Sequence, residues 1–408
     1  MEEICAMYTK SDVLDYVEME DVKFIRLAFC DVFGKQRNIS VLSSELGRAF
    51  DTGISIDASA IRGFTDEAHS DLLLHPDPST LTVIPWRPTH YRVARMFCDI
   101  TYPDGTPYEK DSRHILRTAE KVAEKLGIKC LFGSEFEFYL FKTDEYGNTT
   151  DIPFDNAGYM DIAPEDRGEN VRREICLNLE SMGIRPESSH HEEGPGQNEI
   201  DFRFASPLAA ADNAVTFRSV VKTAALRNGV TASFMPKPIK DKPGSGMHIN
   251  ISVKGTEEKA EEYFMAGVMK HVREITVFLN PMKSSYDRFG EHKAPKYVSW
   301  SRENRSQLIR IPAADGEYRR FELRSPDPSA NVYLAYALLL YSGIDGIRNK
   351  LALPEPCDMN LFSAPKSVTD KLEKLPQSLD EAVKLALESS FVSGIIPKPI
   401  TECIAENE

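Results

Sequence analysis

The sequence lacks a long apolar run, and its cysteines are few and scattered. The longest apolar stretch, residues 332–341, is too short to span a bilayer. Residues 1–4 carry neither the basic nor the apolar run of a signal peptide. The seven cysteines are odd in number and have no metal-binding spacing, which favours reduced thiols. We therefore expect a cytoplasmic protein that has no membrane partner.

The chain is also short of positive charge. Its 49 Lys and Arg residues against 63 Asp and Glu residues leave a net charge of −14, which disfavours binding to nucleic acid. An anionic substrate is not excluded, because metal ions and local arginines can reverse the sign of the charge inside a site. There is no Walker A loop and no Gly-x-Gly-x-x-Gly after a strand, so a nucleotide would be held by another device.

A chain of 408 residues is too long for one ordinary domain. The turn-rich residues 102–107 are the boundary that we predict, which gives a small N-terminal α+β domain at 1–103 and a large one at 104–408. The β-forming residues of the first domain predict strands at 22–30, 37–41 and 81–86, the first two as a hairpin.

Helical spacing of apolar residues dominates the second domain. It predicts a helix that Ser112 caps and Gly127 ends. Further amphipathic helices are predicted at residues 169–182, 209–228 and 257–279. Residues 332–349 are nearly all apolar, so the helix predicted there must be buried.

One strand carries the clearest chemical signal. Side chains alternate between the two faces of a strand, so in residues 132–140 Glu135 and Glu137 share one face and three apolar side chains share the other. Neighbouring carboxylates repel each other unless they face open water or hold cations. The same alternation of polar and apolar faces recurs at residues 199–204, 247–253 and 320–324. Four such strands predict a curved sheet with a charged, concave inner surface.

The polar faces of these strands and the segment 190–199 supply metal-ligand side chains. They are Glu135, Glu137, Glu192, Glu199, Glu322 and His248. Oxygen-rich sets of this kind suit Mg²⁺ or Mn²⁺, and five carboxylates exceed what one ion neutralises, which indicates two or three ions. Arginines are dense nearby at Arg288, Arg305, Arg310, Arg320 and Arg324. Clustered metal ions beside arginines are typical of phosphoryl transfer.

Each feature has an ordinary interpretation when it is taken alone. A single Glu-x-Glu is usually a solvated strand face, His190-His191 is most often a surface pair, and His248 alone is more often a core histidine than a ligand. The functional interpretation rests on the joint occurrence of four alternating strands whose polar faces all carry ligand-type residues.

Ordered motifs along most of the chain resemble the glutamine synthetase family, type I. The matching segments are residues 24–27, 56–64, 135–138, 190–199, 234–238, 244–248, 304–312 and 322–328. The resemblance implies an N-terminal β-grasp-like domain and a catalytic α+β domain with a curved antiparallel sheet and surrounding helices. It also implies a homo-oligomeric ring, single or stacked, whose active sites are shared between adjacent subunits.

The resemblance implies a two-step reaction with named residues. ATP phosphorylates the γ-carboxylate of glutamate, and ammonia then displaces phosphate from the acyl phosphate. By matching positions, Glu137, Glu192 and Glu199 resemble the ligands of one metal ion, and Glu135, His248 and Glu322 those of a second. The glutamate and acyl-phosphate contacts correspond to Arg288 and Arg324, with Gly244 beside the substrate. Nucleotide and phosphate contacts correspond to Phe204, Ser252, Arg305, Arg310 and Arg320. Asp57, reaching from a neighbouring subunit, matches the residue that binds ammonium and helps to deprotonate it.

The chain departs from the family pattern around the acceptor amine. Asp57 is followed by Ala58-Ser59-Ala60 instead of Gly-Ser-Ser, and Pro243 stands where the family has Asn. The flap, one residue shorter here, carries Lys293 where the family has a catalytic glutamate. Near so many carboxylates this lysine should stay protonated, be a poor base and compete with ammonium for Asp57, unless Glu291 takes over.

The departures leave three functions open. The first is a glutamate–ammonia ligase, the second is a γ-glutamyl ligase for another amine, and the third is a catalytically lapsed regulatory protein. The family's last helical segment, which inserts into the opposite ring, is absent after residues 390–399. A smaller assembly than two stacked rings is therefore also open.

Overall fold

The computed structural model describes residues 8–87, 89–314 and 316–406. Residues 1–4 and Cys5, on which part of the leader and thiol expectations depend, lie outside them. In the described part of the chain, we find no helix with the length and apolarity that a bilayer crossing requires.

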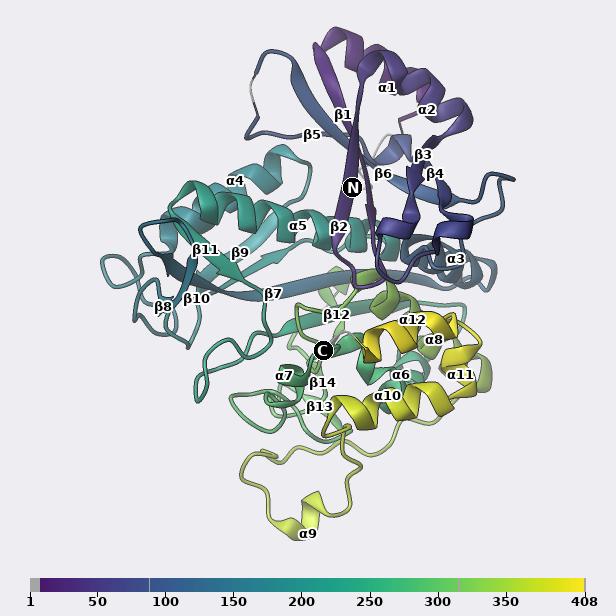
Figure 1. Cartoon of the computed structure of the whole chain (residues 1–408). Helices are drawn as coiled ribbons and strands as arrows, with labels where there is room; N and C mark the ends of the chain where they lie inside the picture. The colour runs from purple at the N-terminus through teal and green to yellow at the C-terminus, as the bar shows by residue number, and fades with distance from the viewer. Residues whose placement is uncertain (1–7, 88, 315, 407–408) are drawn as a thin grey trace.

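The N-terminal domain is a β-grasp-like sheet with helices on one side, at the top of Figure 1. Its strand order is β2-β1-β6-β4-β3, with β5 paired to β6. The elements are α1 (Lys10–Met19), β1 (Val22–Cys30), β2 (Gln36–Leu42), η1 (Ser43–Glu45), α2 (Leu46–Thr52), β3 (Ile54–Asp57), η2 (Ala58–Ala60), η3 (Glu67–His69), β4 (Asp71–Pro76), η4 (Pro78–Thr80), β5 (Thr82–Val83) and β6 (Arg92–Thr101). The predicted β1–β2 hairpin is confirmed. The strand predicted at residues 81–86 is mostly wrong, because Pro85 has no N–H to donate and only Thr82–Val83 pair with β6.

The large sheet has the order β13-β14-β15-β12-β7-β10-β9, with β8 and β11 also paired to β7. Its strands are β7 (Lys129–Thr143), β8 (Thr149–Pro153), β9 (Pro186–His191), β10 (Gln197–Phe202), β11 (Val230–Ser233), β12 (Met247–Lys254), β13 (Trp300–Arg302), β14 (Ile309–Ile311) and β15 (Phe321–Leu323). Most pairs are antiparallel as predicted, whereas β13 and β14 are parallel. The four predicted polar-faced strands are the neighbours β15-β12-β7-β10.

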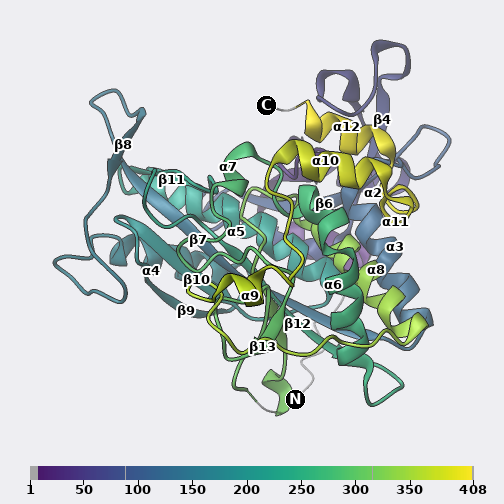
Figure 2. The same cartoon turned by 90° about the horizontal axis from the view of Figure 1, so that it is seen from below.

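The large domain also contains helices, several of which pack against the apolar face of this sheet. They are α3 (Ser112–Lys125), α4 (Glu169–Ser181), α5 (Pro207–Arg227), α6 (Ala260–Leu279), α7 (Lys283–Tyr286), η5 (Gly316–Tyr318), α8 (Val332–Asn349), α9 (Lys366–Thr369), α10 (Leu379–Glu388), α11 (Ser390–Ser393) and α12 (Lys398–Ala405). Helix α5 runs across β7 on the side of the N-terminal domain (Figure 1). Seen from below, the β8 hairpin projects on one side, and α6, α8 and α10 gather on the other (Figure 2).

The apolar face of β7 forms the core beneath the acidic face. Phe136 and Phe138 are fully buried, and their rings lie 5.0 and 6.2 Å from the ring of Phe217 on α5. The buried helix predicted from residues 332–349 is confirmed as α8. Burying these apolar side chains fixes the face of β7 that its two glutamates must take.

A network of charges, centred on the buried Arg113, joins the two domains. We call it the joint, and its members are Asp77, Asp99, Arg113, Arg117 and Asp212. Arg113, on α3, reaches Asp212 at 2.8 and 3.0 Å, Asp99 at 2.9 Å and Asp77 at 2.9 Å. Arg117 binds Asp77 and Asp99 from one turn further along α3.

The sequence predicted Ser112 as the N-cap of α3, but this prediction is wrong, because the cap is Asp111. The Asp111 carboxylate accepts hydrogen bonds from the N–H groups of Arg113 and Ile100. Because Ile100 lies in β6, this carboxylate also ties the helix start to the N-terminal sheet.

Candidate active site

The acidic face of the large sheet is assembled by strand register. On adjacent strands His248 pairs with Glu135, Glu199 with Glu137, and Asn250 with Glu322. Cross-strand partners lie about 4.5–5.5 Å apart at Cβ, so residues distant in sequence become direct neighbours. The structure therefore gathers the six predicted metal ligands on one face.

One group on this face consists of Glu135, His248 and Glu322. The Nδ1 atom of His248 lies 3.3 Å from Glu135 and 3.5 Å from Glu322. The three ligand atoms all lie within 4.8 Å of one another. Arg324 and Arg310 pair with the carboxylate of Glu322, Arg310 at 2.7 Å. Burial would raise the pKa of Glu322, but Arg324, His248 and Arg310 lower it to about 2.

A second group consists of His190, Glu192 and Glu199, with Glu137 beside it. His190 Nε2 lies 3.1 Å from Glu192 and 3.9 Å from Glu199. Glu199 is only 8% exposed. Its burial, followed by the nearby charges of Asp201, Glu137 and Glu135, raises its pKa well above the usual value. Such a carboxylate is costly to bury ionised unless a cation joins it.

His191, the next residue, belongs to a different environment. It lies on the other side of β9 and is fully buried, so the surface-pair interpretation is wrong. Its two ring nitrogens contact the Asp155 carboxylate at 2.9 Å and the Glu192 carbonyl at 2.7 Å. Asp155 also accepts bonds from the N–H groups of Arg167 and Gly196. This pair is satisfied by the protein itself, unlike the group around His190.

Arg288 and Gly244 lie together at the edge of the acidic face. A Cβ atom on Gly244 would stand 2.6 Å from Arg288 Cγ, so no side chain fits there. Arg288 is 3% exposed and donates to the carbonyls of Ser325 and Pro326 at 3.0 and 3.4 Å. Arg324 is equally buried, at 2%. The predicted substrate-side residues are thus brought next to the acidic face.

The nucleotide-side residues are divided by the structure. Phe204, Ser252 and Arg320 line a narrow cavity of about 80 Å³ together with Glu135. Arg320 donates from Nε to the Asn250 oxygen at 2.9 Å, which fixes it at the cavity wall. Arg305 instead is exposed in the turn between β13 and β14, away from this lining.

The flap, residues 290–294, contacts the acidic face through Lys293. The ammonium of Lys293 forms an ion pair with Glu193 and lies 5.5 Å from the centre of the Tyr159 ring. Glu291 points elsewhere, with its carboxylate 3.6 Å from Lys237 Nζ.

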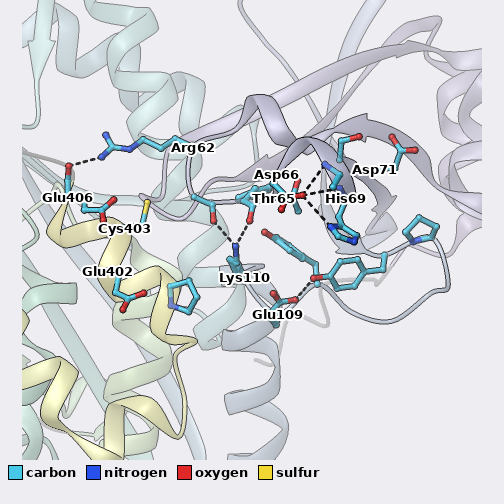
Figure 3. A pocket seen from close by; sticks show the side chains of 18 residues that line it. Arg62, Thr65, Asp66, His69, Asp71, Glu109, Lys110, Glu402, Cys403 and Glu406 are labelled. Atoms are coloured by element: carbon cyan, nitrogen blue, oxygen red, sulfur yellow. Dashed lines mark hydrogen bonds and ion pairs between the residues drawn. The ribbon is translucent and has the colours of Figure 1, made fainter.

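Asp57 ends β3 in the N-terminal sheet, a different sheet from the one that carries the acidic face. Its exposed carboxylate accepts hydrogen bonds from the N–H and hydroxyl of Ser59. The chain that follows lines a cavity of about 900 Å³ with α12, in which Lys110 donates to the carbonyls of Gly63 and Phe64 (Figure 3). None of the described groups of metal-ligand side chains borders this cavity.

The family models match this chain in two parts. The beta-Grasp domain of glutamine synthetase matches residues 21–103, and the catalytic domain of glutamine synthetase matches residues 109–407. The chain belongs to the glutamine synthetase family. Curated glutamine synthetases from Clostridium saccharobutylicum and Methanosarcina mazei are 44% and 45% identical to it. These alignments cover 95% and 94% of this chain and 91% and 90% of the relatives.

Solved structures share the fold of this chain. A complex of GmaS with ADP superposes with a TM-score of 0.87 at 27% identity, covering 97% of this chain and 94% of that one. Plasmodium falciparum glutamine synthetase superposes with a TM-score of 0.85 at 22% identity, covering 98% and 95%, and shows the shared fold.

Several residues at this glutamine-synthetase site were not singled out from the sequence. Gln197 and the Gly246 N–H both donate to Glu137, at 3.0 and 2.8 Å, and Asn250 donates to Glu135 at 2.8 Å. Alternation on β12 placed Asn250 on the polar face, but a role for it depends on register. Glu193 and Lys237 lie in segments that resemble the family, but no local pattern indicated their contacts, because their partners lie 100 and 54 residues away on the flap.

Proposed function

We propose that this protein is an ATP-dependent ligase that joins glutamate and ammonia to form glutamine. The observation that carries the proposal is the acidic face. It holds two groups, each of two carboxylates and one histidine, and these lie beside the buried guanidinium groups of Arg288 and Arg324. An anionic γ-carboxylate that attacks anionic ATP needs such positive charge to lower the repulsion between them. Relatives of 42–45% identity named glutamine synthetase support the same activity.

The donor set fits two or three Mg²⁺ or Mn²⁺ ions. Glu199 is buried among carboxylates whose charges raise its pKa, and a divalent cation would offset this cost. Glu137, Glu192 and Glu199 would hold one ion, with His190 next to them. Glu135, His248 and Glu322 would hold another. When bound, such ions neutralise phosphate charge and act as Lewis acids.

The remaining predicted residues divide between the two substrates. Phe204, Ser252 and Arg320 would contact the nucleotide in the cavity next to Glu135, and Arg310 and Arg305 would contact its phosphates. Arg288 and Arg324 would orient glutamate and stabilise the charge that develops on the acyl phosphate. Gly244 leaves space for the substrate because a side chain there would strike Arg288.

Asp57 would serve the active site of an adjacent copy of the chain. It would bind ammonium and accept its proton, which leaves ammonia as the nucleophile. We therefore propose a homo-oligomer with shared active sites, either a single ring or stacked rings, working in the cytoplasm. We also place the boundary between the domains at residues 103 and 104, in keeping with the two matched ranges.

The test is release of phosphate from ATP in the presence of glutamate, Mg²⁺ or Mn²⁺, and ammonium. Release that requires all four components, with glutamine as the product, is the expected result. An enzyme that binds ATP and metal but releases no phosphate with any amine would contradict the proposal and favour a regulatory protein.

A second candidate is ligation of glutamate to a larger amine. The observation that favours it is Lys293, which places a cation where the family has a carboxylate. The same assay with a panel of primary amines decides between the two. Phosphate release with a larger amine and none with ammonium would establish the second candidate.

A further inference from the structure

The flap is a closed turn attached to both buried arginines. Gly290 N–H donates to the Ala294 carbonyl at 3.0 Å, and Ala294 N–H donates to the Glu291 backbone carbonyl at 2.8 Å. Glu291 N–H donates to the Arg288 carbonyl at 3.2 Å, and Arg324 Nη2 donates to the Lys293 carbonyl at 3.5 Å. These hydrogen bonds hold the flap backbone next to the two arginines that would bind the substrate.

Two side chains of the flap form ion pairs with two different loops. Lys293 pairs with Glu193, in the turn between β9 and β10, and Glu291 lies 3.6 Å from Lys237, in the loop after β11. The charges are thus reciprocal, a lysine and a glutamate on each side. We infer that these two ion pairs form a latch that holds the flap closed and shields the acyl phosphate from water.

The Lys237 side supplies the stronger argument for closure. The Lys237 side chain is 8% exposed, and its ammonium has no hydrogen-bond partner among the described residues. A buried ammonium without a partner is costly, so the approach of Glu291 favours the closed position of the flap. An opened flap would leave Lys237 buried and unpaired.

The Lys293 side depends on an unusual backbone. His292 and Lys293 have φ angles of +42° and +67°, a left-handed pair that side chains with a Cβ rarely adopt. Such a conformation persists where its surroundings hold it. Here it directs Lys293 toward Glu193 and the face of Tyr159. An exposed ion pair contributes little alone, but the cation–π contact with Tyr159 and the second pair act on the same turn.

The latch matters because water competes with ammonia for the acyl phosphate. If water attacks the acyl carbon, its oxygen forms the new C–O bond, phosphate leaves with the electron pair of the broken C–O bond, and water loses a proton. The products are glutamate and phosphate, so ATP is consumed without amide formation. This inference rests on the proposed function and makes Lys293, Glu193, Glu291 and Lys237 positioning residues for it.

The test compares phosphate release without added amine to release with saturating ammonium, in the full-length protein. K293M, E193Q and E291Q should each raise the ratio of amine-independent to amine-dependent release, by about 3- to 10-fold for pairs of this strength. K240M removes a nearby exposed lysine outside the latch and should leave the ratio unchanged. K293R should keep it close to that of the unmodified protein.

A charge exchange at the second ion pair separates a latch from a direct role of Lys293 in catalysis, because it leaves position 293 unchanged. The double variant E291K/K237E restores this ion pair with reversed polarity and should bring the ratio back to within about twofold, as expected for a pair acting as a unit. A double variant as leaky as E291Q alone would overturn the latch. So would a K293M ratio that equals that of K240M.

Hydrogen exchange tests the latch even if the proposed reaction fails. Amide exchange in the peptide that spans residues 288–296 should be faster in K293M and E291Q than in K240M. Exchange that is equal in all three variants would overturn the latch. An unmodified protein without ligase activity would overturn the proposed function, while the exchange rates would still decide on the latch.

Discussion

The joint and the acidic face both hold several carboxylates that are largely shielded from solvent. They differ in what surrounds these carboxylates: arginines in the joint, and other carboxylates around Glu199 on the acidic face. In the joint, Asp77, Asp99 and Asp212 all face the guanidinium groups of Arg113 or Arg117. Burial would raise the pKa of Asp77, but these arginines and the Ser79 hydroxyl lower it to about 2. On the acidic face, Glu199 faces other carboxylates, and its pKa rises instead.

The difference separates a structural charge cluster from a functional one. Carboxylates that are paired within the protein stabilise the ionised form and need no further partner. Carboxylates that face one another keep a cost that a cation from solution can offset. The pKa of Asp77 is lowered by partners within the protein, whereas Glu199, whose pKa is raised, is a carboxylate that a cation could stabilise. The shift belongs to the single residue and not to the whole face, because Arg324, His248 and Arg310 lower the pKa of Glu322 on the same acidic face.

The largest effect is expected from breaking the joint. R113M should lower the free energy of unfolding by about 3–5 kcal/mol, because it leaves buried carboxylates without their partner. Urea denaturation measures the loss. R348M, at an exposed arginine, should change it by about 0.5 kcal/mol or less. Equal losses in the two variants would remove the structural role of the joint.

On the acidic face, removal of a charge should raise stability when no metal ion is bound. E199Q should lower glutamine formation by at least about 100-fold, as expected for loss of a metal ligand, yet raise thermal stability when EDTA is present. The reason is that the buried charge, and its cost, are removed. E145Q, at an exposed glutamate, should change neither quantity. A fall in stability of E199Q without metal would contradict this account.

Metal binding should stabilise only through the acidic face. Mg²⁺ or Mn²⁺ at about 100 times its dissociation constant should raise the free energy of unfolding of the unmodified protein by about 2.7 kcal/mol. The gain should be smaller in E199Q and unchanged in D77N, because Asp77 lies in the joint. Thermal unfolding across a metal titration measures it, and equal gains in E199Q and the unmodified protein would contradict the assignment.

The smallest effect concerns Asp111, which lies next to the joint. Its pKa is raised, whereas the pKa of Asp77 in the joint is lowered. Burial and the charge of Asp99 raise the pKa of Asp111 from 3.8 to about 7. An acid whose folded pKa is raised stabilises the fold at low pH and loses that contribution as the pH rises from about 4 to 7.

D111N should therefore gain stability relative to the unmodified protein across this pH range, by about 1–2 kcal/mol at pH 7. Asparagine is also a good helix N-cap, so the cap of α3 is kept. Urea denaturation at several pH values measures the difference. A difference that stays constant with pH would contradict the shift.

Much of the acidic face could be predicted because alternation along a strand is a local property. Glu135 and Glu137 must share a face once Phe136 and Phe138 are buried, and the same holds on β12 and β10. Alternation along a strand says nothing about Arg305, because this residue lies in an exposed turn between β13 and β14; its role as a phosphate contact stays a prediction.

The sequence by itself determined the family, the buried helix α8 and the faces of the four strands, because periodicity and ordered motifs act over short stretches of chain. Only the tertiary structure decided which carboxylates share a group, because register pairs His248 with Glu135 across 113 residues. It also decided that Lys293 meets Glu193 and that His191 meets Asp155. Such pairs form where packing closes long loops, and no local pattern records them.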